Sequence, residues 1–461
     1  MARRFLLLSI TFVALLAPGL AQAQPEVEEL LREIEGMLGG AAEALDPAAL
    51  VAAELAGVQA AAHMTATAPI TARLITRADA AAHLRQLFDA QLPPARREPM
   101  QAAWHAMGLL PRDQTLEHAV LTLYGSQVGG FYDPVRDVLF LLDDMPAMVQ
   151  VPIVRHELVH ALQDQHVDLG AWLAGAEQDE DRAAALQAVL EGHANDVMNR
   201  ANLAPLGLGA DGLAGMQGSP GLLEELRELL GGDEDSGDMS ELLDLGIDAS
   251  ALDAFVPRDT PAFLRAQLMF PYVVGTRFVS GYRAAHPEDP GCAALYLRPP
   301  TTTAEVLDPT RWESGALTPD IMPPGTLMPG WTRTFHSPLG RLLTWVLLTN
   351  QADPFAGEPD AARWQTATPD RNVAVGVGWA GDHVAVYSPA PEQSGTYAPD
   401  SVVVAWTARW ASETEAREVA RMLEMRVPTA RITVSGARLD VIFEAPEGLE
   451  DRAMSSVRAW K

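Results

Sequence analysis

The chain has 461 residues, 48% of them hydrophobic, which is enough for a sizeable buried core and for two or three domains. Its formal net charge of −28 would repel the phosphates of nucleic acids, so the composition argues against nucleic-acid binding. Cys292 is the single cysteine, which excludes an intramolecular disulfide. We expect it to be a small buried residue rather than a nucleophile.

Residues 1–23 have the pattern of a signal peptide. Arg3 and Arg4 precede an apolar run, and a small-x-small cleavage site ends at Ala23. No later stretch reaches the roughly 18 uninterrupted apolar residues of a membrane-spanning helix. The sequence therefore predicts a secreted or periplasmic protein whose mature chain has no membrane span.

An N-terminal helical region is expected over residues 24–110. Apolar residues recur at helical spacing in a stretch that begins at Pro25 and ends near Gly39. Further helices are predicted from Pro47 onward, over 70–92 and over 96–108.

The next region, 111–352, changes character. Strands are predicted at 118–124 and 137–142, with glycine- and proline-rich punctuation at 129–134 between them. Residues 204–250 form an acidic, glycine-rich insertion, in which a short amphipathic helix is expected at about 222–230 and a solvated loop at 233–238. Helices are expected again over 261–285 and 339–349.

A smaller C-terminal α+β domain is expected over residues 363–461. The alternating patterns predict strands at 372–378, 382–388, 401–408, 430–435 and 438–444, and helices at 412–425 and 447–459. The fold class predicted for the whole chain is α+β.

The motif that carries chemistry is HExxH, from His156 to His160. On a helix that advances about 100° per residue, His160 lies about 40° from His156, and Glu157 lies about 100° away. Both imidazoles can then bind one metal ion while Glu157 reaches a water bound to it. Apolar residues occupy the opposite face, and we expect Pro152 in the first turn.

A catalytic zinc needs a third protein ligand, which the short pattern HExxHxxGxxH does not supply here because position 169 is Leu. A second helix over 181–202 offers Glu191 or His193. Glu191 shares a face with small alanines and with Asn195, whereas His193 points about 200° away. We therefore favour Glu191 as the ligand. Asn195, and Asp164 on the first helix, could orient the ligand histidines.

These residues resemble the gluzincin branch of the zincin metallopeptidases, in which HExxH is paired with a downstream helical glutamate. The longer runs at 156–166 and 190–194, together with 270–275, 299–305 and 378–382, are similar to a group of uncharacterised secreted bacterial HExxH proteins. The resemblance implies a mainly helical zincin-like domain with a small sheet whose edge strand precedes the metal helix; the 137–142 strand fits that place. Two departures are the long separation of His160 from Glu191, and Asp308 where a histidine is expected.

The resemblance and the chemistry together predict a peptidase with one zinc ion. The zinc would activate a water, and Glu157 would act as the general base on a peptide or protein substrate. Tyr272 is our candidate for stabilising the oxyanion, with Tyr132 and His336 as weaker candidates. Trp379 and Asp382 are expected to serve a turn and the core.

Two other hypotheses remain open. One is a non-proteolytic metal-binding envelope protein that uses its C-terminal domain to recognise a partner. The other is a structural envelope protein with a coincidental motif.

Overall fold

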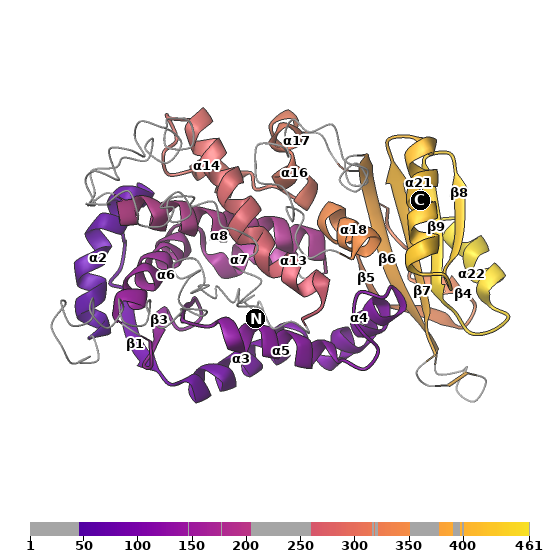
Figure 1. Cartoon of the computed structure of the whole chain (residues 1–461), viewed down its shortest axis with the longest axis horizontal. Coiled ribbons are helices and arrows are strands. Elements are labelled where there is room, and N and C mark those ends of the chain that lie inside the picture. Colours follow the sequence, from indigo (N-terminus) through magenta and orange to yellow (C-terminus); the bar gives the residue numbers. More distant parts are fainter. Residues whose placement is uncertain are drawn as a thin grey trace, which may run out of the picture.

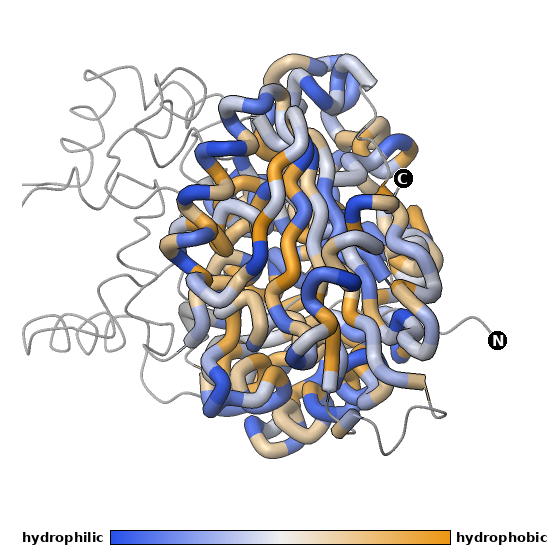
Figure 2. Tube along the Cα trace, turned by 90° about the vertical axis from the view of Figure 1, so that its right-hand side faces the viewer, coloured by the Kyte–Doolittle hydropathy of each residue, from blue (hydrophilic) through white to orange (hydrophobic). Residues whose placement is uncertain are grey.

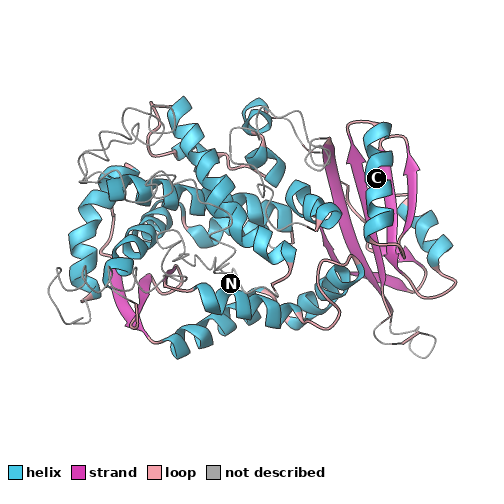
Figure 3. Ribbon diagram, viewed as in Figure 1, coloured by secondary structure: helices cyan, strands magenta, loops and turns pink. Residues whose placement is uncertain are grey.

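The chain folds as an α+β protein, with a mainly helical body and two sheets (Figures 1 and 3). The computed structural model describes residues 46–145, 147–176, 178–203, 260–315, 318, 321–350, 378–390, 397–398 and 401–460. The expected signal peptide, the helix from Pro25, the 204–250 insertion and most of the expected strand at 372–378 lie outside the described residues.

The small sheet has the order β1-β3-β2, in which β1 (Thr71–Ile75) is parallel and β2 (Gly130–Asp133) antiparallel to β3 (Val138–Leu142). The strand expected at 137–142 is confirmed, but it is the central strand and not the edge. The edge strand β2 comes from the segment that was expected to be punctuation. Only the turn after it is irregular, where the backbone N–H groups of Val135 and Arg136 donate to the Asp133 carboxylate.

Two elements of the N-terminal half differ from their predicted type. The segment at 118–124 is part of helix α5 (Leu116–Gln127), because Thr115 caps its first turn and Leu116, Ala119 and Leu123 are buried at helical spacing. The expected helix over 70–92 begins with strand β1 and becomes helix α3 (Arg77–Gln91) only after the Thr76 cap. In both places, tertiary pairing and capping override the local pattern.

Two long helices form the middle of the body, α6 (Ala147–Val167) and α8 (Glu180–Leu203). Helix α6 begins earlier than expected, so Pro152 lies inside the helix and not in its first turn. The predicted helical stretch over 261–285 is confirmed as α13 (Ala262–Phe270), the π-helical turn η4 (Pro271–Gly275) and α14 (Thr276–Ala285).

Two glycines let η4 pack directly on α8. A Cβ atom on Gly192 would overlap the carbonyl group of Gly275, and one on Gly275 would overlap the carbonyl group of Ala188. This close approach brings the π-helical turn against the part of α8 that carries Glu191.

The large sheet has the order β4-β5-β6-β7-β9-β8, and the strands and helices expected after residue 380 are confirmed. Its strands are β4 (Thr326–Met328), β5 (Trp331–Ser337), β6 (Trp379–Pro389), β7 (Val403–Trp410), β8 (Arg431–Ser435) and β9 (Arg438–Glu444). Strands β4 and β5 precede residue 352, so the sheet takes two strands from the region that the sequence placed before the C-terminal domain.

Alternate residues of the large sheet face two different cores. Val384 and Val386 of β6 pack in the main cluster with α4 (Pro94–Ala106), α18 (Gly340–Thr349) and α21 (Glu413–Arg426). Ala385 and Tyr387 face the other way, against α22 (Glu450–Val457). Hydrophobic residues run along the central strands on the side of the molecule that Figure 2 shows. One continuous core thus joins the helical body to the large sheet.

The remaining helices are short or peripheral. They are α2 (Pro47–Ala62), α7 (Leu169–Leu173), η2 (Ala174–Ala176), α15 (Ala293–Leu297), α16 (Thr303–Leu307) and α17 (Pro309–Ser314). Within the described part of the chain, every helix is too short or too polar to serve as a membrane span.

Candidate metal centre

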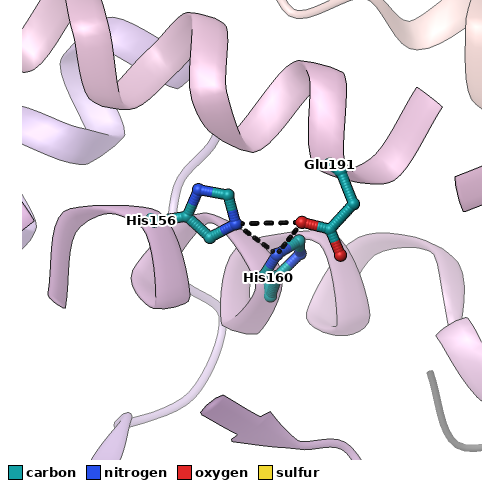
Figure 4. Close-up of side chains that lie close together, drawn as sticks. All are labelled: His156, His160 and Glu191. Carbon is teal, nitrogen blue, oxygen red and sulfur yellow. Dashed lines mark hydrogen bonds and ion pairs between the residues drawn. The ribbon is translucent and has the colours of Figure 1, made fainter. Parts of the chain in front are cut away.

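Helices α6 and α8 bring His156, His160 and Glu191 to one point, as Figure 4 shows. Nε2 of His156 lies 3.0 Å from Nε2 of His160 and 3.1 Å from Oε2 of Glu191. The third side of this triangle, from His160 Nε2 to Glu191 Oε2, is 3.5 Å. The three side chains are between 0% and 3% exposed. This buried group could bind a metal ion.

The triangle has the size that zinc requires. Ligand atoms about 2.0–2.2 Å from a tetrahedral zinc lie about 3.3–3.6 Å from one another, within a few tenths of an ångström of the observed separations. Two imidazole nitrogens and one carboxylate oxygen are also a donor set that zinc prefers. The residues present therefore fit a zinc ion.

Charge and burial oppose each other at the three groups. Burial would raise the pKa of the Glu191 carboxyl, but His160 and His156 hold that pKa far below its usual range. Burial would lower the pKa of His160, but the Glu191 carboxylate raises it to about 9. For His156, burial prevails and lowers the pKa. A carboxylate is thus kept ionised in a buried place, where a cation offsets the cost of its burial.

An amide side chain acts on each ligand histidine. Nδ1 of His160 lies 2.7 Å from Oε1 of Gln163. Nδ1 of His156 and Oδ1 of Asn195 are both buried and without a hydrogen-bond partner among the described residues, and Asn195, acting as an acceptor toward this ring, opposes the lowering of the His156 pKa. The expected role of Asn195 is therefore consistent with its position. Asp164 does not orient His160, because its carboxylate accepts from the Tyr132 hydroxyl and from the Leu169 backbone.

Glu157 lies beside the centre and next to the small sheet. Its Oε2 accepts a hydrogen bond of 2.7 Å from the backbone N–H of Tyr132, which belongs to edge strand β2. Glu157 is 0% exposed. Strand β2 thus fixes the position of the Glu157 carboxylate.

Two tyrosine hydroxyls lie near the centre. The ring of Tyr272, in η4, stacks on that of His156 with their centroids 6.2 Å apart. Burial, then Glu191 and Glu157, raises the pKa of Tyr272 well above its usual value, so its hydroxyl stays protonated. Burial and Glu191 also raise the pKa of Tyr124 to about 12. Tyr124 was missed because its segment was predicted to be a strand.

The other candidates have different partners. His193 is buried, and its Nδ1 lies 2.5 Å from the Tyr296 hydroxyl and not in the metal group. His336 lies on β5, with its Nδ1 3.0 Å from Nε2 of His383. The Trp379 indole donates to Asp382, and both are buried, as expected of core residues. Cys292 is buried too, as expected.

Gln163 was also missed. It lies about 20° from His156 on the helical wheel, so the periodicity that identified His160 could have found it.

Searches of protein-family models, of curated proteins and of solved structures each found no match for this chain. Only the geometry of the site therefore bears on what this protein does.

Proposed function

We propose that this protein is a zinc-dependent peptidase of the gluzincin type that acts outside the cytoplasm, with one zinc ion held by His156, His160 and Glu191. The observation that carries the proposal is the triangle of 3.0, 3.1 and 3.5 Å between the three ligand atoms, beside the Glu157 carboxylate. Three protein ligands from two helices leave a fourth position for water or substrate, as catalytic zinc sites do.

The residues around the ligands support peptide hydrolysis. A bound zinc would lower the pKa of a water and polarise a carbonyl group. Glu157 would take the proton of that water and deliver it to the leaving amine. The neutral Tyr272 hydroxyl, close to both Glu157 and Glu191, would donate to the developing oxyanion. Tyr124 is the alternative donor.

The edge strand supports an extended peptide as substrate. Among the described strands β2 pairs with β3 alone, and the Tyr132 backbone N–H is directed to Glu157 instead of to β3. A peptide could add to an edge strand through main-chain hydrogen bonds, which would place its carbonyl groups near the base.

One observation favours the second candidate, a metal-binding protein without peptidase activity. Glu157 and the three ligands are at most 3% exposed, and closed sites are typical of structural zinc. In that case the C-terminal sheet would serve partner recognition, and Glu157 would be dispensable.

The variant Glu157→Gln separates the two candidates. The amide keeps the size of the side chain but is no base, so we expect one zinc per chain and a loss of turnover of about 10²–10⁴-fold. The measurement is cleavage of an unstructured protein such as casein, beside zinc content. A wild-type protein that binds zinc but cleaves nothing would favour the second candidate, and a Glu157→Gln variant as active as wild type would contradict the mechanism.

A further inference from the structure

A chain of buried hydrogen bonds leads from His160 away from the metal centre. His160 Nδ1 lies 2.7 Å from Gln163 Oε1, and Gln163 Nε2 donates to the Tyr296 hydroxyl over 2.9 Å. The Tyr296 hydroxyl in turn lies 2.5 Å from Nδ1 of His193. His160, Gln163 and His193 are at most 1% exposed, and Tyr296 is 6% exposed. Water therefore has little access to any member of this chain.

The metal centre sets the direction of the chain. If Nε2 of His160 binds a metal ion with its lone pair, the ring proton must be on Nδ1. Nδ1–H then donates to the Gln163 carbonyl oxygen, which leaves the Gln163 amide group to donate to Tyr296. The Tyr296 hydroxyl finally donates to His193. The Gln163 amide and the Tyr296 hydroxyl, in the middle of the chain, each accept one hydrogen bond and donate another, so only one orientation of the Gln163 side chain satisfies both.

Gln163 also links the two ligand helices. Its Nε2 donates a second hydrogen bond, of 3.1 Å, to the backbone carbonyl of Leu190, the residue before Glu191. Gln163, on α6, therefore contacts both the ligand His160 of its own helix and the backbone next to the ligand Glu191 on α8. A hydrophobic residue of the same size would leave the His160 N–H and the Leu190 carbonyl without these partners.

We propose that Gln163 is the positioning residue of the metal centre, which holds His160 in its metal-binding tautomer, and that His193 is the terminal acceptor of this chain and not a ligand. This inference rests on the proposed zinc site. Such outer partners of metal ligands are typically worth about 10- to 100-fold in metal affinity. The same role in many zinc sites is filled by a carboxylate, whereas here it is filled by the neutral amide of Gln163.

The test is zinc affinity, measured by competition with a chromogenic chelator, in Gln163→Leu and in the matched control Gln165→Leu. Gln165 lies on the same helix but bonds the backbone of Thr67 and Ala68 instead of a ligand. We expect zinc affinity to fall about 10- to 100-fold in Gln163→Leu and to stay within about threefold of wild type in the control. Equal affinities in Gln163→Leu and wild type would overturn the inference.

A conservative variant keeps the test valid if Gln163→Leu does not fold. Glu at position 163 can still accept the His160 N–H, so Gln163→Glu should bind zinc at least as tightly as wild type. After substitution of cobalt for zinc, Gln163→Glu should also show visible absorption as intense as that of a four-coordinate cobalt site. Because Glu matches Gln in size and keeps the acceptor oxygen, an affinity about tenfold or more below that of wild type would show that accepting the His160 N–H does not support zinc binding, and would overturn the inference. If the wild-type protein binds no zinc, the proposed function fails. If the wild-type protein binds zinc and Gln163→Leu binds it equally tightly, the proposed function stands and only the positioning role of Gln163 fails.

Discussion

His193 is only two residues from Glu191, yet the two side chains have different partners. Glu191 bonds both ligand histidines, whereas His193 bonds Tyr296. Burial, with a contribution from Arg283, lowers the pKa of His193 to about 3, so its ring is neutral at physiological pH. A neutral imidazole is a good metal ligand in general, and position alone decides between the two residues here.

The corresponding prediction compares Glu191→Ala with His193→Ala. Loss of Glu191 removes a ligand and the only carboxylate of the triangle, so zinc affinity should fall by more than about 100-fold. Loss of His193 removes only the end of the hydrogen-bond chain, and affinity should fall by less than about 10-fold. Chelator competition on both folded variants measures the difference. The opposite order would show that His193 is the third ligand.

At the scale of elements, the site depends on how closely η4 approaches α8. The glycines at 192 and 275 permit this approach, and it places Tyr272 over His156. A π-helical turn is rare and is found disproportionately at functional sites. The turn here lies next to the proposed ligand Glu191.

The variant Gly192→Ala tests that packing. Its Cβ atom would overlap the Gly275 carbonyl, so the two elements must separate, at a cost of about 1–3 kcal/mol in the free energy of unfolding, with weaker zinc binding. Gly281→Ala is the matched control, because Gly281 lies in helix α14 with open space around it. The control should gain roughly 0.5–1 kcal/mol from helix propensity. Urea denaturation of both variants measures this, and similar effects in the two would contradict the packing argument.

The sequence predicts best what depends on local periodicity. The HExxH helix, the face of α8 that carries Glu191, and the C-terminal strands follow from patterns within one element. What it misses depends on partners distant in the chain: β2 is a strand because it pairs with β3, and α5 is a helix because its buried face packs on the core. Tyr124 was not identified as a candidate because its segment, part of α5, was predicted to be a strand. Gln163 was visible on the wheel, but its partner Tyr296 was not.

At the scale of the whole molecule, one buried acid joins two helices of the body and another joins the large sheet to a helix. Asp181 of α8 accepts from the backbone N–H and the hydroxyl of Thr303, at the start of α16. Asp382 of β6 accepts from the backbone N–H groups of Leu339 and Gly340, where α18 begins. Burial raises the pKa of Asp181 to about 8 and that of Asp382 to about 6.

The Asp181 shift predicts a dependence of stability on pH. Its carboxyl holds a proton in the folded state between about pH 4 and pH 8, where the unfolded chain has released it. Stability therefore falls as pH rises through this window, by at most about 1.4 kcal/mol per pH unit from this group. Asp181→Asn cannot ionise, so the stability of the variant relative to wild type should increase from pH 5 to pH 8. Urea denaturation at both values measures it, and a difference that does not change with pH would contradict the shift.

We expect this chain to bind one zinc ion through His156, His160 and Glu191. Elemental analysis of the purified protein tests it most directly, beside a His156→Ala/His160→Ala variant whose fold is verified by circular dichroism. We predict about one zinc per chain in wild type and almost none in the variant. Zinc absent from the wild-type protein even after loading, or equally present in the folded double variant, would contradict the account.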